Sequence, residues 1–393
     1  MLSEHFKYSL LILFAVAFIA TSIVYRPILK IAKSRHIVDS PEARKLQKQP
    51  VPVMGGIAVF FGIAVGVCVS NMLCNASSLY VVLGVSIVML YLGFIDDVVT
   101  IRAWQRFLLE LAMGFLLTIG LRYYIADFQG MWGVGYLPLW LGLVLSSITF
   151  VGIINAINMI DGVDGLSSAF SILIMVCLGI VCFLAHDFAF AALAAIFVGA
   201  LLPFFFHNVF GLKSKMYVGD GGTMMTGAVI SALVFTILRR NNPILSLESS
   251  ENFSRVAFCL AVMSIPIADC LRVMFGRMLQ GLSPFLPDKT HLHHYLFSIG
   301  YSHIAITAIE IALNLAVIVI FLISWLLGAS FTIQLLIVIL SAGAADLGIV
   351  LLIKKMQKRN SALYKRLQKR AEVSHFERKG IWLKIQKFID GKE

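Results

Sequence analysis

Long apolar runs alternate with short polar segments along almost the whole of this chain of 393 residues. Most runs approach the roughly 20 residues that an α-helix needs to cross a bilayer. We therefore predict an all-α polytopic integral membrane protein with about eleven transmembrane helices. The predicted spans cover residues 7–29, 53–73, 79–95, 105–124, 137–154, 166–185, 188–206, 222–239, 255–273, 303–327 and 330–353.

Composition supports the membrane class and limits the partners. Hydrophobic residues make up 59% of the chain and charged residues 13%, about half the charged share of a soluble protein. The net charge of +11 comes from basic residues in short loops and one tail, which favours contact with anionic membrane lipids over nucleic acid. The six cysteines lie in or beside apolar runs without a CxxC pair, so we predict neither disulfides nor cysteine metal ligands.

The distribution of basic residues predicts the orientation of the bundle. Basic residues follow the first span and fill the tail after residue 353. By the positive-inside rule both segments are cytoplasmic, so eleven spans place the N-terminus outside and the C-terminus in the cytoplasm. The chain then divides into one transmembrane bundle, 1–353, and a basic tail, 354–393. The tail could form an amphipathic helix on the membrane surface or be a topogenic, partly disordered segment.

Polar residues recur at every third position directly after the fifth predicted span: Asn155, Asn158, Asp161 and Asp164. In a helical segment, residues three apart lie on one face. Carboxylates beside a membrane mark a functional site by default, and amide and carboxylate oxygens suit Mg²⁺ better than zinc. A polar loop broken by two glycines is the competing interpretation.

Two further acidic segments lie on the same predicted side. Asp96 and Asp97 end the third span, where both their mutual repulsion and the helix dipole are unfavourable unless a cation or a substrate proton is present. A solvated helix end is the alternative. The sequence VGDGGT at 218–223 precedes the eighth span, where glycines allow backbone N–H groups to approach an anion. Next to the other clusters, Asp220 becomes a candidate metal ligand, although Gly-Asp turns are common.

Three histidines lie within four residues: His291, His293 and His294. They lack the cysteine partners and the spacing of a zinc site. With Arg277 and Lys289 close in sequence, they are better suited to donate to phosphate oxygens, unless the cluster is only structural. Lys48, before Gly55 and Gly56, could hold a phosphate or a base edge, or serve as a topogenic charge.

Together these motifs resemble those of the polyprenyl-phosphate N-acetylhexosamine-1-phosphate transferases. The matching segments are GFIDD at 93–97, NAINMIDGVDGL at 155–166, VGDGG at 218–222 and PDKTHLHH at 287–294. The resemblance covers about residues 30–353 and keeps the family's order. Leu292 interrupts the histidines. In this respect the sequence resembles the branch of the family that uses UDP-N-acetylglucosamine and undecaprenyl phosphate. The branch that makes lipid I typically has three consecutive histidines.

The resemblance implies a reaction and a location. A polyprenyl phosphate attacks the β-phosphorus of UDP-N-acetylglucosamine, and UMP leaves. The site lies on the cytoplasmic face of a bacterial inner membrane, and Mg²⁺, or Mn²⁺ instead, helps the two polyanions to approach. Another UDP-N-acetylhexosamine or UDP-MurNAc-pentapeptide is an alternative donor. Direct attack and a covalent aspartyl intermediate are both compatible with the motifs, and a homodimer is expected by analogy.

The resemblance also assigns roles to residues. The predicted metal ligands are Asp220 with Asn158 or Asn155. The predicted catalytic carboxylates are Asp96 or Asp97, as base or phosphate-site group, and Asp161 and Asp164, as groups that bind the nucleotide or organise the site. The predicted substrate contacts are His291, His293, His294, Lys48, Gly221, Arg277 and Lys289.

A different class of protein competes with this interpretation. An ion-coupled transporter would place carboxylates near the midpoints of its spans. Four acids do lie within or near spans: Glu110, Asp269, Glu310 and Asp346. The clusters, however, lie at span ends on one predicted side, which favours an enzyme. A structural scaffold is the weakest alternative, because it needs no converging acids.

Overall fold

The computed structural model describes residues 2–39, 50–74, 76–99, 101–240, 252–284, 289–375 and 380–391. The helices are α1 (Leu2–Ser34), α2 (Gly55–Leu73), α3 (Leu79–Val99), α4 (Ala103–Leu121), α5 (Leu139–Met159), α6 (Leu166–Leu184), α7 (Phe188–Phe210), α8 (Gly219–Leu238), α9 (Arg255–Val262), α10 (Ser264–Leu279), α11 (Leu292–Ile299), α12 (His303–Leu326), α13 (Phe331–Gly343), the π-helical turn η3 (Ala344–Gly348), α14 (Ile349–Lys358), α15 (Ala362–Val373) and α16 (Gly380–Asp390). Two short antiparallel pairs join β1 (Val38–Asp39) to β2 (Val51–Pro52) and β3 (Asp127–Met131) to β4 (Val134–Tyr136).

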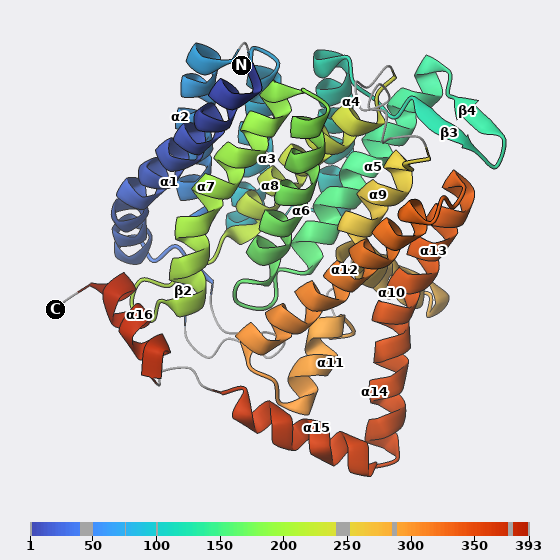
Figure 1. Ribbon diagram of the computed structural model, residues 1–393. Helices are drawn as coiled ribbons and strands as arrows, with labels where there is room; N and C mark the ends of the chain where they lie inside the picture. The colour runs from blue at the N-terminus through green and yellow to red at the C-terminus, as the bar shows by residue number, and fades with distance from the viewer. Residues whose placement is uncertain are drawn as a thin grey trace.

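The helices confirm the predicted all-α polytopic membrane class. Within the described residues, ten helices are long and apolar enough to cross a membrane, and a bent helix pair raises the number to eleven if it counts as one span. Figure 1 shows the long helices side by side, with the N-terminus and the β3–β4 hairpin at one end. The C-terminal helices α15 and α16 lie at the opposite end.

Several helices extend beyond their predicted spans, and in α3 and α5 this changes where the polar residues lie. Helix α3 continues to Val99 and α5 continues to Met159, whereas the predicted spans stop at 95 and 154. Asp96 and Asp97 therefore lie in the last turn of α3 and not in a loop. Asn155 and Asn158 likewise lie on α5.

The predicted continuous span at 255–273 is broken in the structure. Helices α9 and α10 meet at Met263 with a bend of 77°. Asn314 of α12 bridges the break: its Oδ1 accepts from Ser264 Oγ at 2.9 Å and from Ile265 N at 3.0 Å, and its Nδ2 donates to Val262 O at 3.0 Å. One buried amide thus satisfies backbone groups on both sides of the break, as an apolar surrounding requires.

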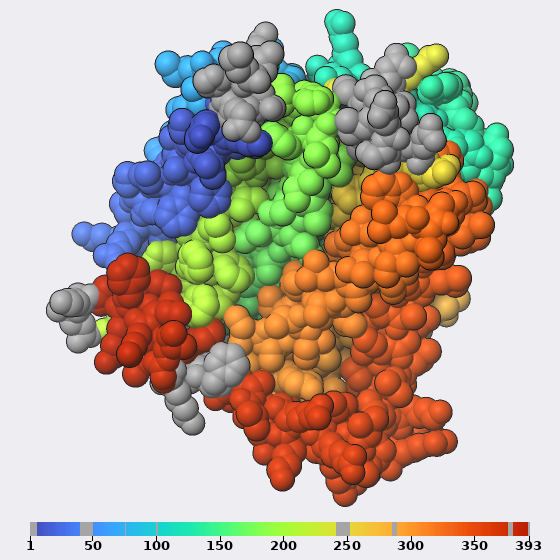
Figure 2. Space-filling model, viewed as in Figure 1, coloured from blue at the N-terminus to red at the C-terminus, as the bar shows by residue number. Residues whose placement is uncertain are grey.

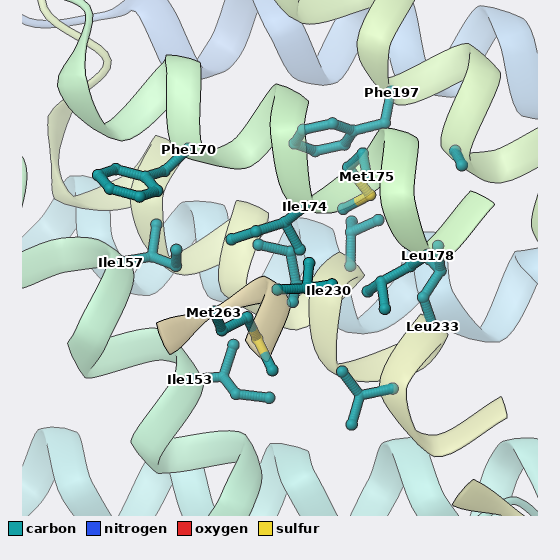
Figure 3. Close-up of a cluster of buried hydrophobic side chains, with 14 of the residues drawn as sticks. Ile153, Ile157, Phe170, Ile174, Met175, Leu178, Phe197, Ile230, Leu233 and Met263 are labelled. Carbon is teal, nitrogen blue, oxygen red and sulfur yellow. The ribbon is translucent and has the colours of Figure 1, made fainter. Parts of the chain in front are cut away.

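Helix α8 is the centre of the bundle, and the window of its most apolar residues is 100% buried. Figure 3 shows Ile230 and Leu233 of α8 among apolar side chains of α5, α6 and α7, including Ile157 and Phe197. A helix that is apolar on all sides belongs in such a position. Large apolar side chains that remain exposed on the outer helices, such as Leu11 and Leu340, are suited to lipid contact.

Ion pairs close the end of the bundle that carries the β3–β4 hairpin. Arg255, 1% exposed, donates to Asp127 Oδ2 at 2.6 Å, and Arg239 pairs with Asp187 at 2.8 Å. Arg240 lies over the ring of Tyr136. The basic pair Arg239–Arg240, which departs from the charge rule on the predicted outer side, is thus held by local partners.

The basic tail contains two helices that lie against the bundle. Ser302 donates from its N–H to Ser374 Oγ at 3.1 Å, which joins the end of α15 to the segment before α12. Helix α16 packs on the end of α7, where the ring of Trp382 lies 4.4 Å from that of Phe210. Figure 2 shows the tail across the lower end of the molecule, below α11 and α14.

Candidate active site

A close approach of α3 and α8 brings two acidic motifs together. A Cβ on Gly93 would lie 2.4 Å from Gly221 N, so only glycine allows this backbone contact. At this contact the backbone N–H of Asp220 donates to Asp97 Oδ2 at 3.0 Å. The sequence predicted an anion at the start of α8, and the structure places the Asp97 carboxylate there. Gly221, predicted to contact substrate, is instead buried against Leu90 O.

Arg106 of α4 is the cation that balances the acidic ends of α3 and α8. Its Nη1 lies 3.0 Å from Asp96 Oδ2 and 3.6 Å from Asp220 Oδ2, and its Nε lies 2.9 Å from Glu110 Oε1. The Asp96 carboxylate also accepts from Ile101 N at 2.6 Å. Asp96 is thus held by two donors. The repulsion expected between neighbouring carboxylates is relieved by a protein cation.

The four polar residues at three-residue spacing do not share one face. Helix α5 ends at Met159, so the helical prediction holds for the two amides only. Asn155 donates to Glu110 Oε2 at 2.8 Å and thereby supports the Arg106 cluster. Asp161 and Asp164 lie in the turn before α6, where Gly165 has a φ of +78°. This left-handed conformation, which glycine adopts readily, ends the helical periodicity.

Asp161 is accessible to water, yet protein surrounds its carboxylate on most sides. Ser167 Oγ donates to its Oδ1 at 2.5 Å. Loss of solvation is the main cause that raises the pKa of Asp161 to about 7, and repulsion from Asp220, Asp164 and Asp39 adds to it against the opposing effect of Ser167. The exposure and the loss of solvation are compatible if the carboxylate lies in a recess. Such a group can exchange a proton near neutral pH.

The Asp164 carboxylate differs from that of Asp161, because two basic side chains lie against it. Its Oδ2 lies 2.5 Å from Lys215 Nζ and 2.9 Å from His303 Nδ1. Burial opposes its ionisation, but the bonds and charges of His303 and Lys215 keep the pKa of Asp164 below its ordinary value. Thr307 also donates to the Asp164 carbonyl at 3.2 Å. Asp164 therefore links the turn to α12 and to the segment before α8.

The histidine segment packs directly on this turn. A Cβ on Gly162 would lie 2.7 Å from His293 Nε2, so glycine allows the contact. The rings of His291 and His293 stack with centroids 5.5 Å apart, and the ring of His294 lies 4.4 Å from that of His293. Burial, followed by the neighbouring His294, lowers the pKa of His293 to about 3, so the ring is neutral at pH 7. Its Nδ1 is buried without a hydrogen-bond partner.

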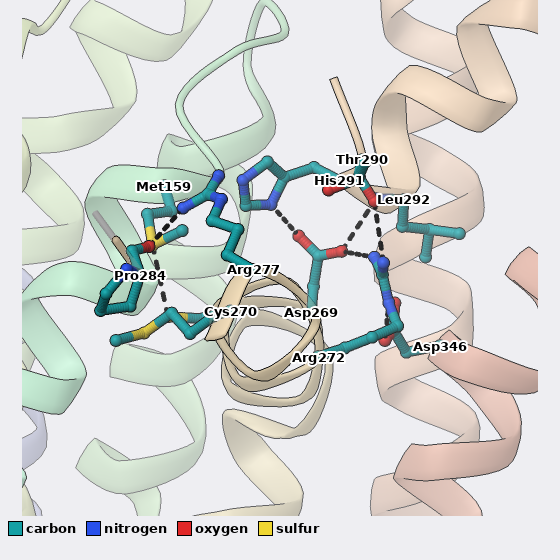
Figure 4. A network of polar contacts seen from close by, with 11 residues as sticks. Met159, Asp269, Cys270, Arg272, Arg277, Pro284, Thr290, His291, Leu292 and Asp346 are labelled. Atoms are coloured by element: carbon teal, nitrogen blue, oxygen red, sulfur yellow. Dashed lines mark hydrogen bonds and ion pairs between the residues drawn. The ribbon is translucent and has the colours of Figure 1, made fainter. Parts of the chain in front are cut away.

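Figure 4 shows the buried network that holds His291. Asp269 Oδ2 lies 2.6 Å from His291 Nδ1, which leaves Nε2 of this ring for a ligand. Arg272 bonds Asp269, and its Nε lies 2.6 Å from Asp346 Oδ2 in η3. Arg272 also donates to Thr290 O at 2.8 Å. Two of the intramembrane acids, Asp269 and Asp346, thus have a definite role in supporting the histidine segment.

The remaining predicted substrate contacts have varied surroundings. Arg277 is buried and donates to Pro284 O at 2.5 Å, whereas Lys289 is exposed. Lys48 lies outside the described residues. Glu310 is fully buried, and its Oε1 has no hydrogen-bond partner.

Water accessibility divides the carboxylates into two groups. Asp97, Asp161 and Asp220 are open to water, the Asp220 side chain being 37% exposed. Asp96, Glu110 and Asp164 are more buried and are held by cations. The first group can be reached from water, and the second group is held by neighbouring protein side chains.

Sequence reasoning missed the groups that hold these acids: the cations Arg106 and Lys215, and the imidazole of His303. Arg106 and Glu110 form an i,i+4 pair at the start of an otherwise apolar helix, which is a local signal for a membrane-end ion pair. Lys215 lies between α7 and α8, shortly before Asp220. No local sequence pattern could have linked His303 to Asp164, because the two residues are 139 positions apart.

The surroundings of Asp220 fit a Mg²⁺ ion that takes further oxygens from a substrate. Within the described ranges, no group of three or more His, Cys, Asp and Glu side chains is arranged to hold a metal ion. Mg²⁺ is, however, commonly held by one or two protein oxygens together with phosphates and water. The Asn158 side chain lies beside Asp220, and its amide oxygen is a ligand of the type that Mg²⁺ prefers. The Asn155 amide, in contrast, donates to Glu110.

The fold and the site define a polytopic membrane protein with water-accessible carboxylates beside a histidine cluster at one end of its bundle. Residues 79–238 match the family described as glycosyl transferase family 4. This match and the names of the relatives below confirm the resemblance to the polyprenyl-phosphate N-acetylhexosamine-1-phosphate transferases.

Three named relatives are similar over most of the chain. A Bacillus subtilis (strain 168) protein, "Probable undecaprenyl-phosphate N-acetylglucosaminyl 1-phosphate transferase", is 28% identical over 80% of this chain and 83% of its own. The "Undecaprenyl-phosphate alpha-N-acetylglucosaminyl 1-phosphate transferase" of Escherichia coli (strain K12) is 26% identical over 70% and 72%. The protein of that name from Salmonella typhi is 27% identical over 70% and 72%.

Proposed function

We propose that this protein transfers N-acetylglucosamine-1-phosphate from UDP-N-acetylglucosamine to undecaprenyl phosphate and releases UMP. The observation that carries the proposal is the meeting of Asp97, Asp161 and Asp220 with His293 at one end of a membrane bundle. A site at the membrane edge suits one lipid substrate and one water-soluble substrate. The names of the relatives support the same pair of substrates.

In the proposed reaction, an oxygen of the lipid phosphate forms a bond to the β-phosphorus of the nucleotide sugar. The bond from that phosphorus to the bridging oxygen breaks, and UMP carries the electron pair away. Asp161, with a pKa of about 7, takes the last proton of the lipid phosphate. Asp269 engages Nδ1 of His291 and orients the ring, so that Nε2 is the atom through which His291 would contact the diphosphate.

Mg²⁺ completes the proposed site. Asp220 and Asn158 would hold the ion, which when bound neutralises charge on the diphosphate. Asp97 keeps the start of α8 in place through the Asp220 N–H, and Arg106 balances the acids behind it. We place the site on the cytoplasmic face of a bacterial inner membrane, since the basic tail lies at the same end of the bundle.

An ion-coupled transporter is the less supported alternative. Transporters that use broken helices leave backbone groups at the break free to bind the substrate or ion. Here Asn314 bonds the groups on both sides of the break between α9 and α10.

The proposal is tested with purified protein, undecaprenyl phosphate, Mg²⁺ and labelled donors. The donors are UDP-N-acetylglucosamine, UDP-N-acetylgalactosamine and UDP-MurNAc-pentapeptide, each tested alone. We expect lipid-linked label from the first, and its loss in Asp220→Asn but not in Glu372→Gln, a change of an exposed tail carboxylate. Absence of lipid-linked label with all three donors would overturn the proposal, and label from another donor alone would correct the sugar.

A further inference from the structure

The last helix of the chain is attached to the segment that leads into the site. This segment, residues 211–217, is called the Lys215 loop. Helix α16 buries Trp382, 9% exposed, against Phe210, which directly precedes the loop. Arg26 of α1 donates to Ile389 O at 3.4 Å and holds the end of α16 from the other side. The tail helix thus has a defined position at the base of the loop.

Asp390, near the end of α16, bonds the Lys215 loop at several atoms. Its Oδ1 accepts from Ser214 Oγ at 2.7 Å and from Ser214 N at 3.0 Å, and its carboxylate accepts from Leu212 N at 3.2 Å. Although partial burial acts in the opposite direction, these bonds keep the pKa of Asp390 below its ordinary value. Successive N–H groups turned toward one anion fix the backbone conformation that presents them.

Other contacts hold the loop from the side of α1. Tyr25 donates from its hydroxyl to Ser214 O at 2.9 Å, and Lys33 Nζ donates to Lys213 O at 2.6 Å. His207 Nδ1 lies 2.9 Å from Ser214 Oγ. Ser214 is therefore fixed through its N–H, its hydroxyl and its carbonyl, and Asp390 of the tail bonds the first two of these groups.

The residue after Ser214 enters the candidate site. Lys215 Nζ lies 2.5 Å from Asp164 Oδ2, and both side chains are partly buried. Because Lys215 directly follows Ser214, the hydrogen bonds that fix the Ser214 backbone also fix the point from which the Lys215 side chain reaches Asp164. The chain of contacts therefore runs from Asp390 through Ser214 to Lys215 and Asp164.

We infer that Asp390 is a positioning residue, through which the C-terminal tail sets the Lys215–Asp164 ion pair of the active site. This inference rests on the proposed function for its activity readout only. Asp390 acts through Lys215 and touches no substrate. A chain that lacks α16, or that has the helix displaced, has a misdirected Lys215 and reduced transfer.

The test compares Asp390→Ala with Glu372→Ala in the full-length protein. Both variants remove one tail carboxylate, but the exposed Glu372 lies in α15, away from the loop. We expect kcat/KM for UDP-N-acetylglucosamine to fall about tenfold in Asp390→Ala, within the range of coupling between contacting residues. Glu372→Ala keeps the wild-type value. In a Lys215→Met background the further loss from Asp390→Ala should vanish.

A second readout does not depend on activity. An amine-acetylating reagent modifies Lys215 at a rate that its ion pair limits, and the exposed Lys358 of α14 serves as the internal reference. We expect Lys215 to be acetylated faster relative to Lys358 in Asp390→Ala, and at the wild-type rate in Glu372→Ala.

The outcomes separate this inference from the proposed function. An unchanged Lys215 rate in Asp390→Ala overturns the inference, whether or not the wild-type protein transfers the sugar phosphate. Equal losses from Asp390→Ala with and without Lys215 overturn it as well, because the tail would then act on stability alone. If the wild-type protein shows no transfer activity but the acetylation rates are as expected, the inference stands and the proposed function is rejected.

Discussion

The approach of α3 to α8 gives a sharp prediction for Gly93→Ala. The added Cβ would lie between 2.4 and 2.5 Å from three backbone atoms of Asp220 and Gly221, which cannot rotate away. Ordinary contacts begin near 3.4 Å, so the helices must separate by about 1 Å. Such overpacking costs about 1–3 kcal/mol. The same shift would stretch the 3.0 Å bond from Asp220 N to Asp97 Oδ2 beyond hydrogen-bonding distance.

The matched control is Gly84→Ala on the same helix, where an added Cβ meets nothing within 4 Å. Thermal unfolding in detergent and the transfer assay are measured for both variants. We expect Gly84→Ala to keep the wild-type Tm or exceed it, because alanine favours helices over glycine by up to about 1 kcal/mol. Gly93→Ala should lower both Tm and activity. Equal behaviour of the two variants would refute the role given to the α3–α8 contact.

Three further changes probe charge in the site. Arg106→Gln should lower Tm, by the equivalent of about 3 kcal/mol, because it leaves buried carboxylates unbalanced; a Tm equal to that of wild type would show that another cation compensates. The folded-state pKa of Asp161 lies above the value of about 3.9 in unfolded chains, so the native state loses stability as pH rises from about 4 to about 7. Asp161→Asn should therefore raise Tm at pH 8 but not at pH 4, and a rise of equal size at both pH values would contradict the titration. Asp346→Asn should raise KM for UDP-N-acetylglucosamine several-fold, since Arg272 would hold Asp269 less firmly against His291; an unchanged KM would limit Asp346 to a structural role.

The sequence predicts the membrane helices well because each span is a local property. An apolar run must satisfy its backbone within the membrane, and a helix does so without distant partners. The bend between α9 and α10 was not predictable in this way, because Asn314, about fifty residues further along the chain, bonds the groups at the break. The helical periodicity ends after Met159 for a local reason, namely the two glycines of the turn, Gly162 and Gly165.

The acidic and histidine motifs lie at one end of the bundle and define the candidate site, but the sequence does not show which member does what. Asp96 and Asp97 are adjacent in sequence, yet Arg106 holds the first and the start of α8 faces the second. The different partners of Asp96 and Asp97 arise from the packing of α4 and α8 against the end of α3. Gly221 likewise allows the helix contact and is not a surface for substrate.

The most direct measurement is the identity of the nucleotide released when purified protein acts on UDP-N-acetylglucosamine and undecaprenyl phosphate. Transfer of a sugar phosphate breaks the bond between the β-phosphorus of the donor and the bridging oxygen, so chromatography should find UMP in equal amount to the lipid-linked product. Release of UDP would mean that only the sugar is transferred, and would contradict the central claim. UMP formation that persists in Asp220→Asn would contradict the proposed metal position.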